Sequence, residues 1–352
     1  MSELTKHILV TGGTGYIGSH TTVELLQEGY RVTIADDLSN SRAEVVDAVG
    51  EITGKRPAFV NVDLCNKDAV DALFKANSFD AIIHFAAHKQ VGESVTAPLK
   101  YYRNNLTGLI NLVEASLTSG TTRMVFSSSC TVYGQPDRLP VDENSPVRQP
   151  ESPYGNTKKI AEEILRDAAA AYAALKVISL RYFNPVGAHN SSLIGEYPIG
   201  PPQNLMPVLT QLAIGKRNSM EVFGDDYNTP DGSCIRDYIH VVDLAKAHVV
   251  AIRRLLSASN SDAFETFNLG TGKGLSVLEV IRAFEEVNGV KLNYRISGRR
   301  PGDVEQIYGS TEKANTVLGW KAELNLNEMV KSAWAWEKML DKKEKSKNTA
   351  SL

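Results

Sequence analysis

Tyr154 and Lys158 stand four residues apart in the stretch SPYGNTK. Residues at this spacing share one face of a helix, and Ser152 and Pro153 are suited to its N-cap and its first turn. A free tyrosine titrates at about pH 10, but a neighbouring ammonium group and a helix N-terminus both favour its phenolate. A phenolate at neutral pH is a base that can take a proton from an alcohol. On spacing alone, the pair also fits an ordinary solvated helix face.

A run of serines precedes this pair, in FSSSCTVYG. Ser127, Ser128 and Ser129 stand at the carboxyl end of an apolar stretch that is typical of a strand, and ligands of open α/β sheets bind at that end. One of these hydroxyls can orient a substrate oxygen; the alternative is a serine-rich turn. We expect Tyr133 to be structural.

Three glycines, Gly12, Gly15 and Gly18, form the run GGTGYIG between a strand-like and a helix-like stretch. Such glycines allow a tight turn, close approach of a pyrophosphate and close packing of helix on strand, and the helix N-terminus attracts the phosphates. Asp36 ends the next strand, where a carboxylate binds the adenosine ribose and repels a 2′-phosphate. We therefore predict NAD rather than NADP. The oxidised nicotinamide of NAD would add positive charge beside the tyrosine. Asp63, at the end of the third strand, can bind the adenine amino group or cap the strand.

The elements around these residues alternate through the first half of the chain. Strands are expected over 7–12, 31–37, 58–64, 81–87, 123–129 and 176–184, and helices over 16–27, 42–52, 68–75, 99–117 and 153–174. Apolar strands that alternate with helices predict parallel pairing with both faces covered. The fold class is therefore α/β, with a Rossmann-type doubly wound parallel sheet.

The alternation stops after Asn184, where a stretch rich in glycine, proline and asparagine begins. Further helices are expected over 205–214, 241–256, 276–288 and 326–340. We predict an NAD-binding domain over 1–184 and a smaller mixed α/β C-terminal substrate domain over 185–340, some segments of which return to the first domain. The lysine-rich end, 341–352, is predicted to be a disordered tail.

Composition excludes several classes of protein. Lys and Arg total 38 against 41 Asp and Glu, a net charge of -3, so nucleic acid is not an expected partner. The apolar stretches are shorter than the about 20 residues needed to span a bilayer, and the polar start predicts no signal peptide. Cys65, Cys130 and Cys234 are widely spaced and fit a reducing compartment. The scattered histidines predict no metal site.

Longer stretches resemble the UDP-galactose 4-epimerase family of the extended short-chain dehydrogenase/reductase superfamily, from about His7 to Trp336. They are TGGTGYIGSH, HFAAHKQVGES, FSSSCTVYG, SPYGNTK, RYFNPVGAH, NLMP, DGSCIRDYIHVVDLA and NLGTG. The resemblance implies an isomerase that interconverts UDP-galactose and UDP-glucose through NAD-dependent oxidation at C4, rotation of the 4-ketosugar and hydride return to its other face. It also implies permanently bound NAD and a cytoplasmic homodimer that pairs through the helices over 99–117 and 153–174.

The resemblance assigns roles to individual residues. Tyr154 would be the acid/base and Lys158 would bind the nicotinamide ribose, while Ser129 and Thr131 would contact the sugar hydroxyl. The expected NAD site comprises Gly12, Gly15, Tyr16, Ile17, Gly18, Asp36, Asn40, Asp63, Leu64, Phe85, Ala86, Lys89, Asn104, Ser127, Tyr154, Lys158 and Tyr182. The expected UDP-sugar site comprises Ser129, Tyr154, Asn184, Asn204, Leu205, Phe223, Arg236, Arg300, Asp303 and Ile307. The two arginines fit as pyrophosphate clamps, because a guanidinium fork matches phosphate oxygens.

Some positions depart from the family pattern. Cys130 stands where members often have alanine, Ala87–His88 where they often have glycine–leucine, and Asp37 where an asparagine often contacts NAD. Ile307 is intermediate between the bulky aromatic residue that excludes N-acetyl sugars and the small residue that admits them. UDP-N-acetylhexosamines therefore remain alternative substrates.

Other activities remain as alternatives. Epimerases that act on UDP-pentoses or UDP-uronates stay open, because only sugar-pocket contacts separate them from an epimerase of UDP-hexoses. A nucleotide-sugar dehydratase uses the same tyrosine and lysine but needs an acid pair where Cys130 and Thr131 stand. A non-catalytic NAD-binding protein would be expected to lack the tyrosine or the lysine, and both are present.

Overall fold

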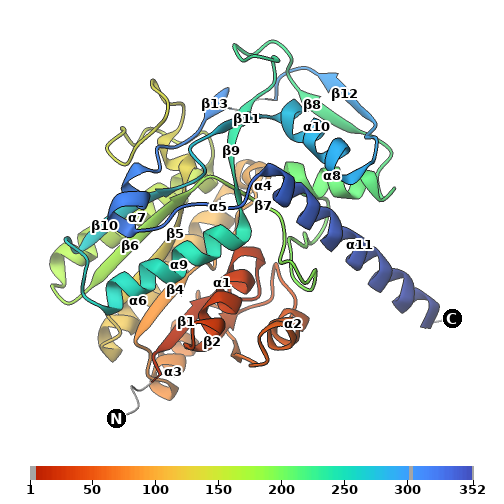
Figure 1. Ribbon diagram of the computed structural model, residues 1–352. Helices are drawn as coiled ribbons and strands as arrows, with labels where there is room; N and C mark the ends of the chain where they lie inside the picture. Colours follow the sequence, from red (N-terminus) through yellow and green to blue (C-terminus); the bar gives the residue numbers. More distant parts are fainter. Residues whose placement is uncertain (1–4, 301–303, 351–352) are drawn as a thin grey trace.

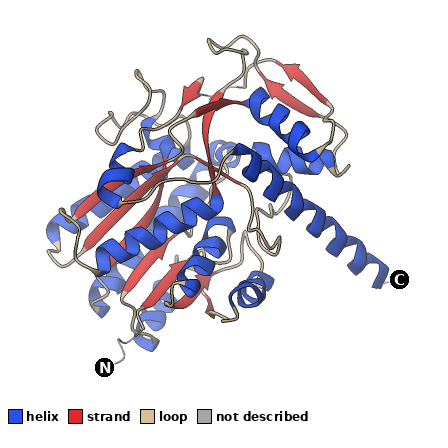
Figure 2. Cartoon of the chain, in the orientation of Figure 1, coloured by secondary structure: helices blue, strands red, loops and turns tan. Residues whose placement is uncertain are grey.

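The structure, a computed structural model, describes residues 5–300 and 304–350 of the chain. A parallel sheet forms its centre, with helices on both faces and a smaller unit at one end (Figures 1 and 2). Within the described residues this sheet has seven strands in the order β10-β6-β5-β4-β1-β2-β3, all parallel. The strands are β1 (His7–Thr11), β2 (Arg31–Asp36), β3 (Ala58–Asn61), β4 (Ala81–His84), β5 (Arg123–Ser129), β6 (Lys176–Tyr182) and β10 (Phe264–Leu269). The predicted doubly wound sheet is confirmed.

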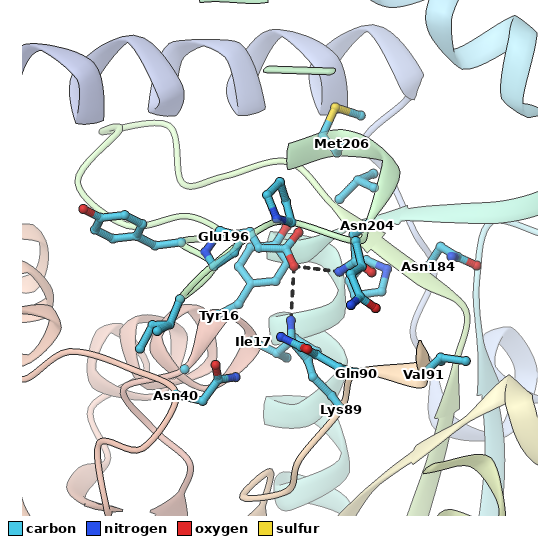
Figure 3. Close-up of a pocket in the computed structure, with 18 of the residues that line it drawn as sticks. Tyr16, Ile17, Asn40, Lys89, Gln90, Val91, Asn184, Glu196, Asn204 and Met206 are labelled. Atoms are coloured by element: carbon cyan, nitrogen blue, oxygen red, sulfur yellow. Dashed lines mark hydrogen bonds and ion pairs between the residues drawn. The ribbon is translucent and has the colours of Figure 1, made fainter. Parts of the chain in front are cut away.

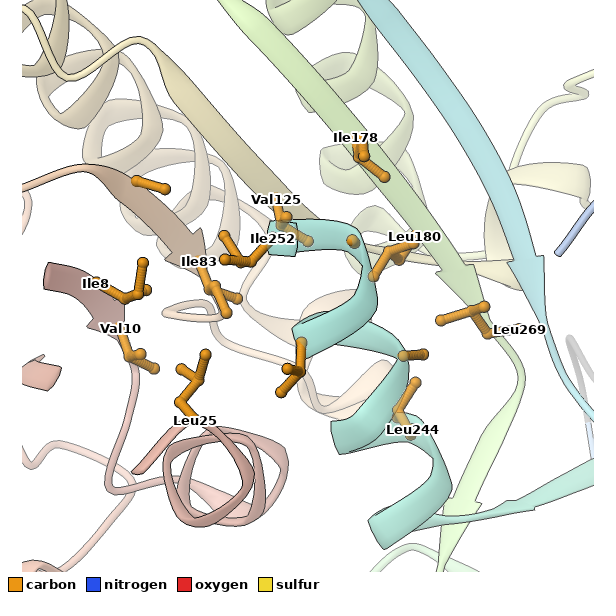
Figure 4. Close-up of a cluster of buried hydrophobic side chains, with 14 of the residues drawn as sticks. Ile8, Val10, Leu25, Ile83, Val125, Ile178, Leu180, Leu244, Ile252 and Leu269 are labelled. Atoms are coloured by element: carbon orange, nitrogen blue, oxygen red, sulfur yellow. The ribbon is translucent and has the colours of Figure 1, made fainter. Parts of the chain in front are cut away.

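Alternating side chains of the strands pack on the two helical layers. One layer contains α1 (Tyr16–Gln27), α2 (Glu44–Thr53) and α9 (Val241–Leu256); the other contains α3 (Lys67–Ala76), α6 (Gly108–Ser119) and α7 (Pro153–Ala171). In β1, Ile8 and Val10 face α1 and α9, whereas Leu9 faces the second layer. Figure 4 shows the first of these two cores, which includes Leu25 and Leu244. Because β1 and β4 lie where the strand order reverses, their carboxyl ends open a crevice at which such sheets bind ligands.

The smaller unit combines short strands with helices. Its strands are β7 (Asn184–Val186), β8 (Met220–Phe223), β9 (Ile235–His240), β11 (Gly274–Ser276), β12 (Tyr294–Ser297) and β13 (Gln306–Ile307), and its helices are α8 (Leu205–Ala213), α10 (Val277–Asn288) and α11 (Leu326–Ala350). Between β9 and β11 the chain returns to the first unit, where α9 packs on α1 and β10 pairs with β6. No helix in the described ranges is both long and apolar enough to cross a bilayer.

Two predictions differ from the structure. The expected helix over 99–117 is divided into α5 (Pro98–Tyr102), a π-helical turn (Arg103–Thr107) and α6, and the separate helix α4 (Val91–Thr96) precedes it. The segment 341–352, expected to be a disordered tail, continues α11 as far as Ala350. Glu344 stabilises this extension, because its carboxylate pairs with Lys216 at 2.9 Å and accepts a hydrogen bond from Tyr197 at 3.2 Å.

Candidate active site

A cavity of about 1600 Å³ lies at the carboxyl ends of the central strands, between the two units. Its lining includes each described residue that the sequence assigned to a site, from both halves of the chain. They are Gly12, Gly15, Tyr16, Ile17, Gly18, Asp36, Asn40, Asp63, Leu64, Phe85, Ala86, Lys89, Asn104, Ser127, Ser129, Thr131, Tyr154, Lys158, Tyr182, Asn184, Asn204, Leu205, Phe223, Arg236, Arg300 and Ile307. Asp303 lies outside the described residues.

The glycine loop joins β1 to α1 with almost no free space around it. Gly12 has a φ of +69°, and a Cβ there would lie 2.7 Å from the backbone nitrogen of Ala86. A Cβ on Gly18 would lie 2.2 Å from the carbonyl oxygen of Gly12. Gly15 is the N-cap of α1 and makes no side-chain cap. The loop therefore presents bare backbone and a helix N-terminus to the cavity, as a pyrophosphate requires.

Asp36 lies beside this loop, at the end of β2. Its buried carboxylate accepts hydrogen bonds from the backbone nitrogens of Thr14 and Leu38 at 3.2 and 3.0 Å, and from the Ser41 hydroxyl at 2.9 Å. A carboxylate offers about four acceptor sites, so capacity remains for a ligand hydroxyl. This arrangement fits the ribose of an adenine dinucleotide.

Tyr154 and Lys158 enter the cavity from the first turns of α7. The Ser152 hydroxyl caps the helix by accepting a hydrogen bond from the Gly155 backbone nitrogen at 3.2 Å. The ammonium of Lys158 donates to the carbonyl oxygen of Ser127 at 2.7 Å. The predicted cap, helix and strand end are therefore all present, and they bring the tyrosine, the lysine and the serines to one edge of the cavity.

Burial opposes the lowered pKa of Tyr154 that the sequence led us to expect with a lysine and an oxidised nicotinamide beside it. Burial raises the pKa of Tyr154 to about 12, and a hydrogen bond with Ser129 only partly offsets this effect. Burial also lowers the pKa of Lys158 to about 7, although the carboxylate of Glu162 acts in the opposite direction. The lysine thus supplies less positive charge at neutral pH than the spacing alone predicts.

Replacing Lys158 with methionine is expected to stabilise the folded chain at low pH. The pKa of Lys158 is about 7 when folded, against about 10.4 for an unfolded lysine. Unfolded wild type therefore binds more protons between these values, and its stability rises with pH in that window. The gain of Lys158→Met should be about 4 kcal/mol at pH 6, roughly 1.4 kcal/mol for each pH unit between the two pKa values, and should fade toward pH 10. Urea unfolding of both proteins at equal NAD loading checks this; a gain that is constant with pH would contradict it.

Glu196 is a cavity residue that sequence reasoning missed. Its carboxylate accepts hydrogen bonds from Lys89 at 3.1 Å and from Asn204 at 2.7 Å, so it bridges an expected NAD residue and an expected UDP-sugar residue (Figure 3). The Trp336 indole nitrogen donates to the backbone oxygen of Glu196 at 2.9 Å and ties this loop to α11. A single acid in a long glycine- and proline-rich loop carries no spacing signal that would have revealed it.

The opposite end of the cavity contains the expected sugar and uridine contacts. The Arg300 guanidinium lies 5.3 Å from the centre of the Phe223 ring. Arg236 and Ile307 are register partners in the parallel pair of strands β9 and β13. The hydroxyl oxygen of Thr131 is buried and has no hydrogen-bond partner among the described residues. Because a buried polar atom ordinarily has a partner, this hydroxyl fits a role in binding a polar ligand. The described residues contain no group of three or more metal-ligating side chains.

Comparison with known proteins identifies the family. Residues 9–333 match the family model described as GDP-mannose 4,6 dehydratase, which places the chain in that wider family. The UDP-glucose 4-epimerase of Bacillus subtilis (strain 168) is 52% identical over 330 residues, which cover 94% of this chain and 96% of that protein. The chain belongs to the UDP-glucose 4-epimerase family.

Solved structures of this epimerase family have the same fold. The UDP-glucose 4-epimerase of Stenotrophomonas maltophila, with bound NAD and formylated UDP-arabinopyranose, has a TM-score of 0.93 and 47% identity over 96% of this chain and 99% of that one. The Bifidobacterium longum UDP-glucose 4-epimerase, in complex with NAD+ and UDP, has a TM-score of 0.91 and 44% identity, and the match covers 95% of this chain and 98% of that one. The resemblance stated from the sequence is confirmed at the level of the family.

Proposed function

We propose that this chain is a UDP-glucose 4-epimerase that interconverts UDP-galactose and UDP-glucose with permanently bound NAD. One observation carries the proposal: a single cavity contains the glycine loop with Asp36, the Tyr154–Lys158 pair, and the arginines at the opposite end. Such a cavity can hold a dinucleotide and a nucleotide sugar end to end, with the tyrosine between them. The relatives named above support the same reaction.

The chain's own residues have distinct tasks in this reaction. The glycine loop and Asp36 hold the dinucleotide, and Arg236 and Arg300 hold the UDP group. NAD, when bound, supplies the hydride acceptor and donor at C4 of the sugar. Tyr154 removes the O4 proton as C4 is oxidised, and returns a proton after the 4-ketosugar has turned over.

Charge beside Tyr154 determines whether it can act as a base. Its pKa of about 12 reflects burial without a neighbouring full positive charge. Positive charge from Lys158 and from the oxidised nicotinamide would each lower this pKa. Ser129 contributes by hydrogen bonding to the phenol, and this contact also lowers the pKa of Tyr154.

The direct test is incubation of purified protein with UDP-galactose and no added cofactor. The expected product is UDP-glucose, and the same mixture should form from either sugar. Protein denatured by heat is the control, and released NAD is measured by its absorbance after enzymatic reduction. A folded, NAD-containing sample that converts neither sugar would overturn the proposal.

UDP-N-acetylhexosamines stay an alternative substrate class. Ile307 is buried against Cys130 and Phe183 at the sugar end of the cavity. Replacing Ile307 with alanine should raise the ratio of kcat/KM for UDP-GalNAc to that for UDP-galactose by about tenfold, because it removes apolar volume beside the sugar. The two sugars are assayed on the same preparation, so loss of folding cancels from the ratio. An unchanged ratio would show that Ile307 does not limit this space.

A dehydratase reaction has less support in this cavity. Elimination of water requires an acid next to the catalytic tyrosine, and the positions expected for it are Cys130 and Thr131. Burial raises the pKa of the Cys130 thiol to about 12, so the thiol is a poor acid near neutral pH. A 4-epimerase needs no such group.

We also propose that the chain acts as a homodimer through the helical layer that contains α5, α6 and α7. Exposed apolar side chains are present there: Leu99 on α5 is 76% exposed and Ile110 on α6 is 42% exposed. Leu99→Asp should shift sedimentation toward the monomer at micromolar concentration, because burying an unpaired charge in an interface is costly. Ile296→Asp, on β12 in the other unit, is the matched exposed control. Monomeric wild type would contradict the dimer.

A cytoplasmic location is our proposal for this chain. Cys65, Cys130 and Cys234 are all unpaired in the structure. Free thiols persist where glutathione keeps proteins reduced.

The small negative net charge of -3 does not favour binding to nucleic acid.

A further inference from the structure

Glu162 is a buried carboxylate one helical turn beyond Lys158 on α7, outside the cavity lining. Its Oε1 atom accepts hydrogen bonds from the hydroxyls of Ser128 at 2.6 Å and Ser179 at 2.9 Å. Arg181 donates to both oxygens, from Nε at 2.9 Å and from Nη2 at 2.5 Å. The side chains of Glu162 and Arg181 are each only 3% exposed. Four hydrogen bonds on one buried carboxylate fix this part of α7 against β5 and β6.

The same contacts hold the serine end of β5. Ser127 and Ser129 line the cavity, and Ser128 between them reaches Glu162 instead. The Ser127 carbonyl oxygen accepts the hydrogen bond from Lys158, and Ser129 is the residue whose hydroxyl bonds to Tyr154. Successive side chains of a strand point to opposite faces. Glu162 therefore holds the one residue that separates the two partners of the catalytic pair.

Glu162 is also the carboxylate that Lys158 faces. Among the titratable groups near Lys158, burial lowers the pKa of His84 on β4 to about 3, so this histidine is neutral near pH 7. Burial raises the pKa values of Tyr133, after β5, and of Tyr182 on β6, so both are neutral as well. Tyr101 on α5 has a raised pKa for the same reason.

Within this set, charge near Lys158 at neutral pH comes from Glu162 and from Arg181, its ion-pair partner. The carboxylate raises the pKa of Lys158 against the larger opposing effect of burial. Loss of the carboxylate would leave a buried guanidinium near the lysine, and like charges disfavour each other's charged forms. The lysine would then lose its proton at lower pH.

We propose that Glu162 is a positioning residue for the epimerase reaction: it anchors Ser128, which stands between the β5 serines that contact Tyr154 and Lys158, and it supplies the negative charge that Lys158 faces. This inference rests on the proposed function. Glu162 touches neither ligand site, so its effect should be on turnover and on its pH dependence rather than on UDP-sugar binding.

The test is the pH profile of UDP-galactose turnover in Glu162→Gln. The alkaline limb of kcat should move down by about one pH unit, and kcat near pH 8 should fall about tenfold, while KM stays within twofold. Glu265→Gln is the matched control, because Glu265 on β10 is 5% exposed, lies outside the cavity lining and accepts two hydrogen bonds from Arg254 on α9. This control should keep the wild-type profile. An unmoved alkaline limb in Glu162→Gln, or an equal shift in Glu265→Gln, would overturn the inference.

A milder pair of variants decides the question if Glu162→Gln does not fold. Ser128→Ala and Ser179→Ala each remove one hydroxyl donor to the same oxygen and leave the ion pair with Arg181 intact. Ser128→Ala should lower kcat at least about threefold, because Ser128 lies between the serines that contact Tyr154 and Lys158. Ser179→Ala should stay within twofold, because Ser179 lies on β6. Equal effects would refute the positioning role. Wild type is assayed first: absence of turnover there counts against the proposed function, whereas turnover with unaffected variants counts only against Glu162.

Discussion

Tyr154→Phe is expected to lower the turnover of UDP-galactose by about 10³-fold, within the range that positioned acid–base groups contribute. The variant keeps the ring that fills the first turn of α7 and loses only the hydroxyl. Without it, the proton of O4 has no acceptor as C4 is oxidised. Because Ser129 bonds to the phenol and lowers its pKa, Ser129→Ala should slow the same step to a lesser extent.

The measurement separates turnover from binding. Calorimetry with UDP should give an affinity within about threefold of wild type, and the NAD content of the purified variant should be unchanged. Tyr172→Phe is the matched control, since Tyr172 follows the other end of α7 and is 53% exposed. Turnover by Tyr154→Phe close to that of wild type would refute the assignment of the acid/base.

Gly18→Ala is expected to cost the chain its bound NAD. The added Cβ would lie 2.2 Å from the carbonyl oxygen of Gly12 and 2.8 Å from the Cα of Gly13. These are backbone atoms of the loop that faces the phosphates, so α1 must move away from the end of β1. We expect NAD content to fall at least about tenfold and the melting temperature to fall by roughly 5 °C, in the range for a destabilisation of 1–3 kcal/mol.

Gly50→Ala provides the control for this change. Gly50 lies inside α2, and its added Cβ would meet its nearest neighbour, Arg56, at 3.4 Å, an ordinary contact. Alanine also favours a helix over glycine, so the control should be neutral or stabilising. NAD content is measured after denaturation, and unfolding is followed by circular dichroism. Normal NAD content in Gly18→Ala would show that the loop tolerates displacement.

Local pattern was enough to predict most of the sheet. The six strands of the first half and the strand–loop–helix around Gly12 are present because apolar β-branched runs and glycine spacing are properties of neighbouring residues. The strand β10 was not predicted, because it follows α9 in the second half and pairs with β6 only through the tertiary fold. The π-helical turn after Tyr102 was also missed, because its residues include no glycine or proline that would mark a change in the helix.

The site was predicted where a residue type belongs to a motif and missed where its role depends on partners in space. Tyr154, Lys158 and Asp36 stand in recognisable stretches, and each lines the cavity. Glu196 and Glu162 are single acids whose partners come from distant parts of the chain. The pKa of Tyr154 was expected to be lowered because spacing reveals a nearby lysine but not the depth at which both side chains are buried.

The return of the chain through α9 and β10 limits how this molecule can be recombined with its relatives. β10 covers the outer edge of β6, and α9 packs on α1. A fragment cut after Asn184 would expose an unpaired strand edge and an apolar helix face, both of which promote aggregation. A chimaera that exchanges sugar selectivity must therefore retain the segment from Val241 to Leu269 with the amino-terminal parent, which requires three splice points rather than one.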